Sequence, residues 1–266
     1  MAKDFPVGAH VVVTGAASGI GRGTAEWLTS AGVRVIALDH HEPDFEVSRY
    51  VAVDLADLAS IEDVAACLGD LSLHGLCNAA GVPGTHPAEV VARVNYLGLR
   101  SLTAALLPQL VPGAAVVNVA SVAGSRWSER VGHHAGLART SAWSEALNYA
   151  ARYQPPEIDA YRFYKEALIV WSRLYASDIL RRKGVRMNCV SPGPVDTPIL
   201  DDFRASMGAQ TVADTIAKTG RAGTPDDVAP AIGFLLGSGS RWIAGLDMPV
   251  DGGLTTLRFA DSFAPN

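Results

Sequence analysis

The sequence predicts one α/β domain in which helices cover both faces of a parallel sheet of seven strands. Three observations lead to this fold class. Short apolar runs rich in β-branched residues alternate with longer segments of helical periodicity. A glycine-rich turn joins the first apolar run to the first helical segment. The chain has no internal repeat, low-complexity tract or Pro/Ser-rich linker, so we expect residues 1–266 to form a single doubly wound domain.

Seven segments are expected to be strands because each is short and apolar and is followed by a turn or by a helical pattern. In chain order they are 10–14, 34–39, 50–54, 75–79, 115–120, 185–191 and 246–250. Since helical segments separate most of them, the strands are expected to run parallel with right-handed crossovers.

Five segments show the spacing of apolar residues that is typical of helices. They are 21–31, about 60–68, 90–110, 161–182 and 226–236. Gly32 and Gly184 follow two of them, and Pro112 lies just beyond a third. Glycine and proline commonly occur at these positions because they end a helix without strain.

Two segments do not fit this alternation. Both follow predicted strands on the carboxyl side, where sheets of this kind bind ligands. We expect an insertion at about 124–159 and a mobile substrate lid at about 194–224. Within the insertion, Trp143, Leu147 and Ala150 recur at helical spacing, which predicts an amphipathic helix.

Composition is ordinary for a soluble globular protein, with 48% hydrophobic residues and a net charge of −5. The acidic balance disfavours nucleic acid as a partner. Apolar runs fall far short of the roughly 20 residues that span a bilayer. The first residues lack the apolar core of a secretion signal. Cys67, Cys77 and Cys189 have no metal-like spacing and are expected to be buried thiols in a cytoplasmic protein.

The glycine-rich turn predicts a dinucleotide site. Gly15, Gly19 and Gly21 allow a tight turn and a close approach of the backbone to a pyrophosphate at the helix N-terminus. Asp39 ends the next strand, at the position expected for a carboxylate on an adenosine ribose, although a turn role is the alternative. Asp54 ends the third strand and either meets the adenine or serves as a turn residue.

The cofactor is expected to be NAD rather than NADP. Asp39 would repel the additional phosphate of NADP, and the turn itself contains no Lys or Arg up to Gly21. Arg22 and His40 leave the alternative open, because either side chain could reach toward a phosphate.

Tyr161 and Lys165 are four positions apart in a predicted helix and therefore share one face. An ammonium beside a phenol favours the phenolate, so the pair predicts a base that takes a proton from an alcohol. Together with the dinucleotide turn, this pair indicates alcohol–carbonyl redox chemistry.

Several motifs occur in the order typical of the short-chain dehydrogenase/reductase family, and the chain resembles that family over nearly its whole length. The motifs are Thr14–Gly21, Asn78–Gly81, Asn95, Ser121, Tyr161 with Lys165, Pro192–Gly193 with Thr197, and Asp251–Gly253. The resemblance implies a Rossmann-type fold, a small alcohol or carbonyl substrate, a nicotinamide cofactor and a homodimer or homotetramer.

The resemblance also implies residue roles. Tyr161 is the general base in oxidation and the acid in reduction, and Lys165 lowers its pKa and holds the nicotinamide ribose. Ser121 binds the substrate oxygen, and Asn95 positions a water in a proton relay. The alternatives are a helix cap for Ser121 and a cap or kink for Asn95. The expected cofactor contacts are Gly15, Ser18, Gly19, Ile20, Gly21, Asp39, Asp54, Leu55, Asn78, Ala79, Gly81, Tyr161, Lys165, Pro192, Gly193, Val195 and Thr197.

One departure from the family is the separation of Ser121 and Tyr161, which are 40 positions apart (121 to 161) where most members place them closer. We favour the insertion between them as a wall or lid of the substrate pocket, with a subunit contact as the alternative. His133 and His134 are expected to be solvated, because no third metal ligand is evident.

Several runs extend beyond the family-wide motifs, namely 75–85, 94–98, 164–172, 185–190, 240–243 and 249–253. These runs resemble bacterial coniferyl-alcohol dehydrogenases. The next resemblance is to bacterial 3α-hydroxysteroid dehydrogenase/carbonyl reductases, which also have such an insertion. Trp127, Trp143, Phe203 and Met207 could line an apolar pocket or serve as packing. The sequence therefore favours an aromatic allylic alcohol such as coniferyl alcohol as substrate, with a hydroxysteroid as the alternative. A non-catalytic NAD-binding sensor is an alternative of another class, although a sensor needs no proton relay.

Overall fold

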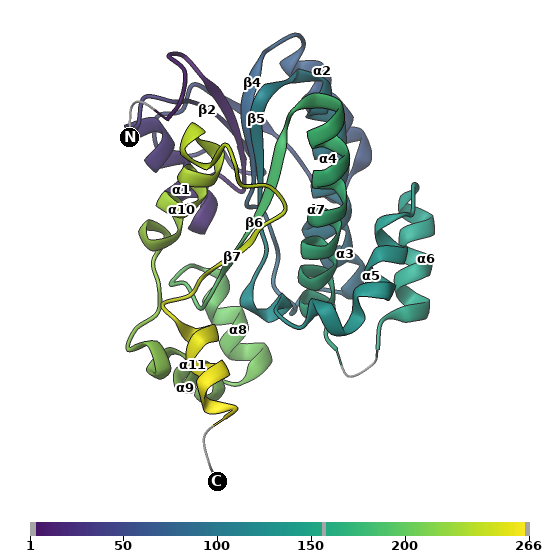
Figure 1. The fold of residues 1–266 in the computed structure, drawn as a ribbon, viewed down its shortest axis with the longest axis vertical. Coiled ribbons are helices and arrows are strands. Elements are labelled where there is room, and N and C mark those ends of the chain that lie inside the picture. The colour runs from purple at the N-terminus through teal and green to yellow at the C-terminus, as the bar shows by residue number, and fades with distance from the viewer. Residues whose placement is uncertain (1–3, 156–157, 264–266) are drawn as a thin grey trace.

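Seven parallel strands form one sheet in the order β3-β2-β1-β4-β5-β6-β7 (Figure 1). The computed structural model describes residues 4–155 and 158–263. The strands are β1 (His10–Thr14), β2 (Arg34–Asp39), β3 (Arg49–Ala52), β4 (Leu73–Asn78), β5 (Leu110–Val119), β6 (Arg186–Pro192) and β7 (Asp247–Val250). The strand order reverses between β1 and β4, and this reversal opens a crevice at the carboxyl edge of the sheet.

Helices cover both faces of the sheet, as expected. Helices α1 (Gly19–Ser30) and α10 (Pro225–Leu236) pack on one face, and α2 (Leu58–Leu68), α4 (Leu99–Leu106) and α7 (Ala160–Lys183) pack on the other (Figure 1). Two apolar cores result, one on each side of the sheet. Close packing of α1 against α10 requires Gly233, because a Cβ there would lie 2.1 Å from the Trp27 ring.

The expected helix at 90–110 is interrupted. The structure has α3 (Ala88–Ala92), a π-helical turn (Arg93–Gly98) and then α4, and β5 already begins at Leu110. Gly98 ends the π turn against the Leu55 carbonyl oxygen, which would lie 2.2 Å from a Cβ at that position. The helical pitch thus changes at the point where the chain must approach another backbone closely. The spacing of apolar residues in the sequence does not predict such a change.

The two segments outside the alternation are helical. The insertion contains α5 (Val131–Ala138) and α6 (Trp143–Tyr153), which confirms the predicted amphipathic helix. The lid segment contains α8 (Ile199–Met207) and α9 (Ala209–Thr219), and α11 (Leu254–Asp261) follows β7. In Figure 1, α5 and α6 lie on the far side of α7 from the sheet, whereas α8, α9 and α11 gather beyond the end of β7.

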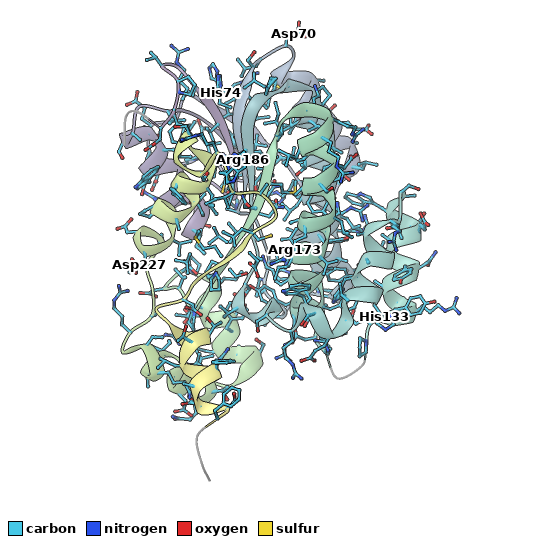
Figure 2. All side chains as sticks on the ribbon, in the orientation of Figure 1. Asp70, His74, His133, Arg173, Arg186 and Asp227 are labelled. Carbon is cyan, nitrogen blue, oxygen red and sulfur yellow. The ribbon has the colours of Figure 1, made fainter. Side chains whose placement is uncertain are left out.

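Buried Arg186 ties the start of β6 to the end of α10. Its guanidinium donates to the carbonyl oxygens of Leu235 and Gly237 and to the Ser240 hydroxyl, at 2.9 to 3.1 Å. Figure 2 shows this side chain inside the body of the molecule. Because both terminal nitrogens of the guanidinium donate to carbonyl or hydroxyl oxygens of the fold, the arginine serves the scaffold.

One thiol differs from expectation. Cys77 and Cys189 are buried and free, but Cys67 is exposed, because it lies on α2 outside the face formed by Ile61, Val64 and Leu68. Arg49 donates to its sulfur. Over the described ranges, no helix has both the length and the apolar character needed to cross a membrane.

Candidate active site

A cavity of about 310 Å³ opens at the carboxyl edge of the sheet, where the strand order reverses. Its walls come from the glycine-rich turn, the ends of β4, β5 and β6, the start of α7 and the lid. The predicted residues that line it are Gly15, Ser18, Gly19, Ile20, Gly21, Ala79, Gly81, Ser121, Tyr161, Lys165, Pro192, Gly193, Val195, Thr197 and Phe203. Residues far apart in the sequence are thus brought to one site.

The glycine-rich turn has no room for side chains. Gly15 has a φ of +66°, and a Cβ there would lie 2.8 Å from the Ala80 Cα. A Cβ on Gly21 would lie 2.1 Å from the Gly15 carbonyl oxygen. The turn therefore exposes backbone at the N-terminus of α1, as a pyrophosphate site requires.

Asp39 is held against this turn. Its Oδ2 accepts a hydrogen bond from the Ala17 amide at 2.9 Å, and its Oδ1 accepts one from the His41 amide. Arg22 is paired with Glu26 at 2.9 Å and with Asp44 at 2.7 Å, so its charge is already matched by two carboxylates. This end of the site thus presents a carboxylate, and its nearest arginine is engaged elsewhere.

Four predicted cofactor residues do not line the cavity, namely Asp39, Asp54, Leu55 and Asn78. Asp54 Oδ1 accepts a hydrogen bond from the Ala56 amide at 2.7 Å, as in an Asx turn. The same oxygen lies 3.7 Å from His40 Nε2. Leu55 is buried in the core beneath Gly98.

The Asn78 amide nitrogen donates to Thr103 Oγ1 and Asn118 Oδ1, at 2.9 and 2.7 Å, within the buried core. Because its side chain links β4, β5 and α4, its place in the structure is that of a scaffold residue.

Tyr161 stands at the first turn of α7 and meets Ser121 across the cavity. Burial raises the pKa of Tyr161 to about 12, the hydrogen bond with Ser121 lowers it, and the charge of Asp159 raises it. The Ser121 hydroxyl also accepts from the Ala123 amide at 3.1 Å, so Ser121 caps the following turn as well as facing Tyr161. The two expectations for Ser121, a site residue and a cap, are compatible.

Lys165 lies beneath Tyr161, with its Nζ 5.6 Å from the centre of the tyrosine ring. The ammonium donates to the Val119 carbonyl oxygen at 2.7 Å, and burial lowers the pKa of Lys165 to about 8. The spacing of the pair predicted that Lys165 would lower the pKa of Tyr161. In the protein without cofactor, burial raises the pKa of Tyr161 by more than any such effect. Both groups are desolvated, and desolvation disfavours each charged form.

Asn95 is fully buried in the π turn and does not line the cavity. Its Oδ1 accepts from the Val82 amide at 2.8 Å, and its Nδ2 donates to the Val82 carbonyl oxygen at 2.9 Å. It therefore fixes the loop after β4, next to Gly81, where a Cβ would lie 3.8 Å from Lys165 Nζ. The π turn agrees with the alternative that Asn95 marks a kink in its helix. The role of Asn95 in a water relay stays a prediction.

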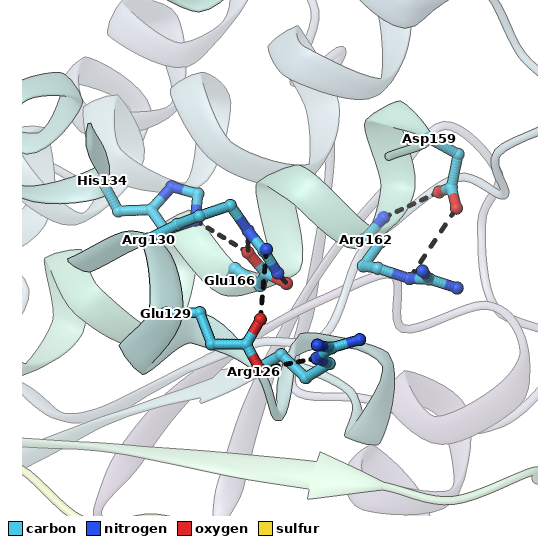
Figure 3. A network of polar contacts seen from close by, with 7 residues as sticks. All are labelled: Arg126, Glu129, Arg130, His134, Asp159, Arg162 and Glu166. Atoms are coloured by element: carbon cyan, nitrogen blue, oxygen red, sulfur yellow. Dashed lines mark hydrogen bonds and ion pairs between the residues drawn. The ribbon is translucent and has the colours of Figure 1, made fainter. Parts of the chain in front are cut away.

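The insertion packs on the outer side of α7. Arg130 donates to both carboxylate oxygens of Glu166, at 2.8 and 2.6 Å, and His134 Nε2 lies 2.9 Å from the same carboxylate (Figure 3). Burial raises the pKa of Glu166, but hydrogen bonds from His134 and Arg130 outweigh it, so the pKa lies below its ordinary value. His134 is completely buried, so the expectation of a solvated pair holds only for His133 (Figure 2).

The cavity gives no support to the insertion as a pocket wall. None of its described residues lines the cavity with Tyr161. Trp127 packs against the Arg173 guanidinium at 4.7 Å, and Trp143 donates to Ser101 on α4 at 2.9 Å. Both tryptophans therefore serve packing rather than substrate contact.

The lid segment does line the cavity. Phe203 lies edge-on to the Tyr161 ring, with 5.0 Å between the ring centres. Ile199 and Asp202 line the same cavity from the same helix. Neither was among the predicted site residues. A sequence signal for them exists, because Asp202 and Phe203 lie three and four positions after Ile199. That spacing places all three side chains on one face of a helix. The side chain of Met207 lies outside the described part.

Known proteins match this chain over most of its length. Residues 9–135 match the family described as short chain dehydrogenase, and residues 146–255 match enoyl-(acyl carrier protein) reductase. A coniferyl-alcohol dehydrogenase from a Pseudomonas species is 41% identical over 92% of this chain and 96% of its own length. A 3-alpha-hydroxysteroid dehydrogenase/carbonyl reductase from Comamonas testosteroni is 30% identical over 93% and 96%.

Solved structures agree with these relatives. The 3-alpha-hydroxysteroid dehydrogenase from Pseudomonas sp. B-0831, complexed with NADH, has a TM-score of 0.81 and 32% identity, covering 96% of this chain and all of its own. The seven-stranded parallel sheet, the glycine-rich turn and these full-length likenesses lead to one conclusion. This chain belongs to the short-chain dehydrogenase/reductase family and is an oxidoreductase of alcohols.

Proposed function

We propose that the protein oxidises an aromatic allylic alcohol, such as coniferyl alcohol, to the aldehyde with NAD. The observation that carries the reaction is one cavity that holds Tyr161, Ser121 and Lys165 beside the glycine-rich turn. The likeness to coniferyl-alcohol dehydrogenase over nearly the whole chain supports the substrate. The Phe203 ring beside Tyr161 offers an apolar contact suited to an aryl group.

The residues present fit a dinucleotide. The backbone of the glycine-rich turn would hold the pyrophosphate, and Asp39 would accept hydrogen bonds from the adenosine ribose. Gly193, Val195 and Thr197 also line the cavity and would contact the nicotinamide. Bound there, NAD supplies the hydride acceptor. The carboxylate of Asp39 and the pairing of Arg22 with two acids both support NAD over NADP.

The protein's own groups handle the proton. Ser121 would hold the substrate oxygen, and Tyr161 would take its proton in oxidation or donate one in reduction. Burial keeps Tyr161 protonated, which is the form that donates to a carbonyl oxygen. Oxidation needs the phenolate, and Lys165, with a pKa of about 8, still carries most of its charge at neutral pH to support it.

A 3α-hydroxysteroid is the second candidate substrate. The solved hydroxysteroid dehydrogenase with a TM-score of 0.81 favours it. A non-catalytic sensor fits less well, because Tyr161, Ser121 and Lys165 meet in one cavity. We also infer a cytoplasmic homodimer or homotetramer, which light scattering of the purified protein tests.

The deciding experiment compares initial rates of NADH formation with coniferyl alcohol, a 3α-hydroxysteroid and a simple secondary alcohol. We expect the highest kcat/KM with coniferyl alcohol, and a higher kcat/KM with NAD than with NADP. No turnover of coniferyl alcohol would reject the substrate, and a clear preference for NADP would reject the cofactor assignment.

A further inference from the structure

Two neighbouring acids on α8 have different surroundings. Asp201 is 82% exposed and pairs with Arg204, one turn along the same helix. Asp202 lines the cavity that contains Tyr161, together with Phe203. Of the two carboxylates, only the second one is therefore in a position to meet a substrate.

The Asp202 carboxylate is tied to the loop after β4 by one hydrogen bond. Its Oδ1 accepts a hydrogen bond from Thr85 Oγ1 at 3.1 Å, and Thr85 belongs to the loop after β4. Its Oδ2 has no hydrogen bond or ion pair with any described residue. One carboxylate oxygen thus remains as an acceptor for a ligand.

Among the described residues, none forms an ion pair with the Asp202 carboxylate. Lys165 is the one basic residue among the described residues that line the cavity, and it donates to the Val119 carbonyl oxygen. A carboxylate in this setting favours a hydrogen-bond donor and repels an anionic substrate group. Phe203, which touches Tyr161, adds a surface for an aromatic ring.

We propose that Asp202 is a specificity-determining residue that accepts a hydrogen bond from a hydroxyl group on the aromatic ring of the substrate. The preferred substrates are then phenols with an allylic alcohol side chain, rather than their phenolic ethers or ring-carboxylated analogues. This inference rests on the proposed oxidation of aromatic allylic alcohols. To that proposal it adds that the lid recognises a ring hydroxyl through the free Oδ2 of Asp202.

The test measures kcat/KM for coniferyl alcohol and for its phenolic methyl ether, in the wild-type enzyme and in Asp202→Ala. The quantity compared is the ratio of the two values, phenol over ether. A hydrogen bond to a charged group changes affinity by about 10- to 100-fold, so we expect the wild-type ratio to be at least about 10 and to fall toward 1 in Asp202→Ala.

Two further variants separate recognition from folding. Asp201→Ala, which removes the exposed neighbour, should keep the wild-type ratio. Thr85→Val removes the hydrogen bond to Asp202 but leaves the carboxylate, so it should keep most of the preference. A purely structural effect of Asp202 would lower kcat/KM for both substrates equally and leave the ratio unchanged.

A wild-type ratio near 1, or an unchanged ratio in Asp202→Ala, would overturn this inference and leave the proposed oxidation standing. If the wild-type enzyme oxidised neither alcohol, the proposed function itself would be rejected, and this inference with it.

Discussion

The insertion and the lid both leave the sheet at its carboxyl edge, yet they pack on opposite sides of α7. The insertion follows β5 and packs on the outer side of α7 through Glu166, the residue after Lys165. The lid follows β6 and packs on the cavity side through Phe203, which touches Tyr161. Two segments that leave the same edge of the sheet can therefore pack against different surfaces and have different roles.

The contacts show what each segment supplies. The insertion meets α7 through a buried carboxylate with two basic partners, an arrangement that tolerates little movement. The lid meets the cavity through Phe203 and Asp202, both partly exposed side chains on a short helix. We expect changes in the insertion to affect the free energy of unfolding, and changes in the lid to affect substrate choice.

The largest effect is expected from Glu166→Gln. The change leaves the Arg130 guanidinium, which is 16% exposed, without its buried carboxylate partner and with only the exposed Glu129 at 3.5 Å. Breaking one side of a buried ion pair costs about 3 kcal/mol of the free energy of unfolding, which urea titration would measure. The KM for alcohol should hold near the wild-type value.

Glu129→Gln is the matched control, because Glu129 is an exposed acid of the same network whose main partner is the exposed Arg126 (Figure 3). Its unfolding midpoint should match that of the wild type. Equal midpoints for Glu166→Gln and Glu129→Gln would show that the buried pair does not anchor the insertion.

A smaller effect, on catalysis, is expected from Phe203→Ala. The substitution removes the ring that lies 5.0 Å from the Tyr161 ring, so kcat/KM for coniferyl alcohol should fall about tenfold through loss of an aromatic contact. The melting temperature should change little. Phe259→Ala, at an exposed ring on α11, serves as control, and an equal loss of kcat/KM there would argue against a specific lid contact.

The smallest effect is a pH dependence of the Glu166 contribution. Hydrogen bonds from His134 and Arg130 hold the pKa of Glu166 below its ordinary value of 4.5. A lowered folded-state pKa stabilises the protein above the unfolded pKa, and this contribution is lost as the pH falls through the folded value. The stability difference between wild type and Glu166→Gln should be full above about pH 5 and shrink in acid. A difference that widened on acidification would contradict this sign.

Much of the scaffold follows from local patterns. The strands at 10–14 and 34–39 have the predicted bounds, because apolar β-branched runs there end at a glycine turn and at Asp39. Helix α7 extends one residue beyond the predicted 161–182 at each end, since an Asp cap precedes it and Gly184 follows it. Most of the predicted cofactor residues also meet at one cavity, because the carboxyl ends of parallel strands share an edge.

Long-range pairings were not predictable from the sequence. Glu166 is joined to partners 36 and 32 positions earlier, and no periodicity reports such a contact. Asn78 looked like a cofactor residue, but its amide is taken up by Thr103 and Asn118, which lie far along the chain. Asp202 was missed because its hydrogen-bond partner, Thr85, lies 117 positions earlier in the chain.

The most direct test of the reaction is Tyr161→Phe, assayed for NADH formation with coniferyl alcohol and for NADH binding by fluorescence. The Tyr161 hydroxyl meets Ser121 in the cavity, so its loss should lower kcat about 100- to 10,000-fold, as expected for a positioned proton-transfer group. The Kd for NADH should stay close to the wild-type value. Turnover at a substantial fraction of the wild-type rate would contradict the assignment of Tyr161 as the proton-transfer group.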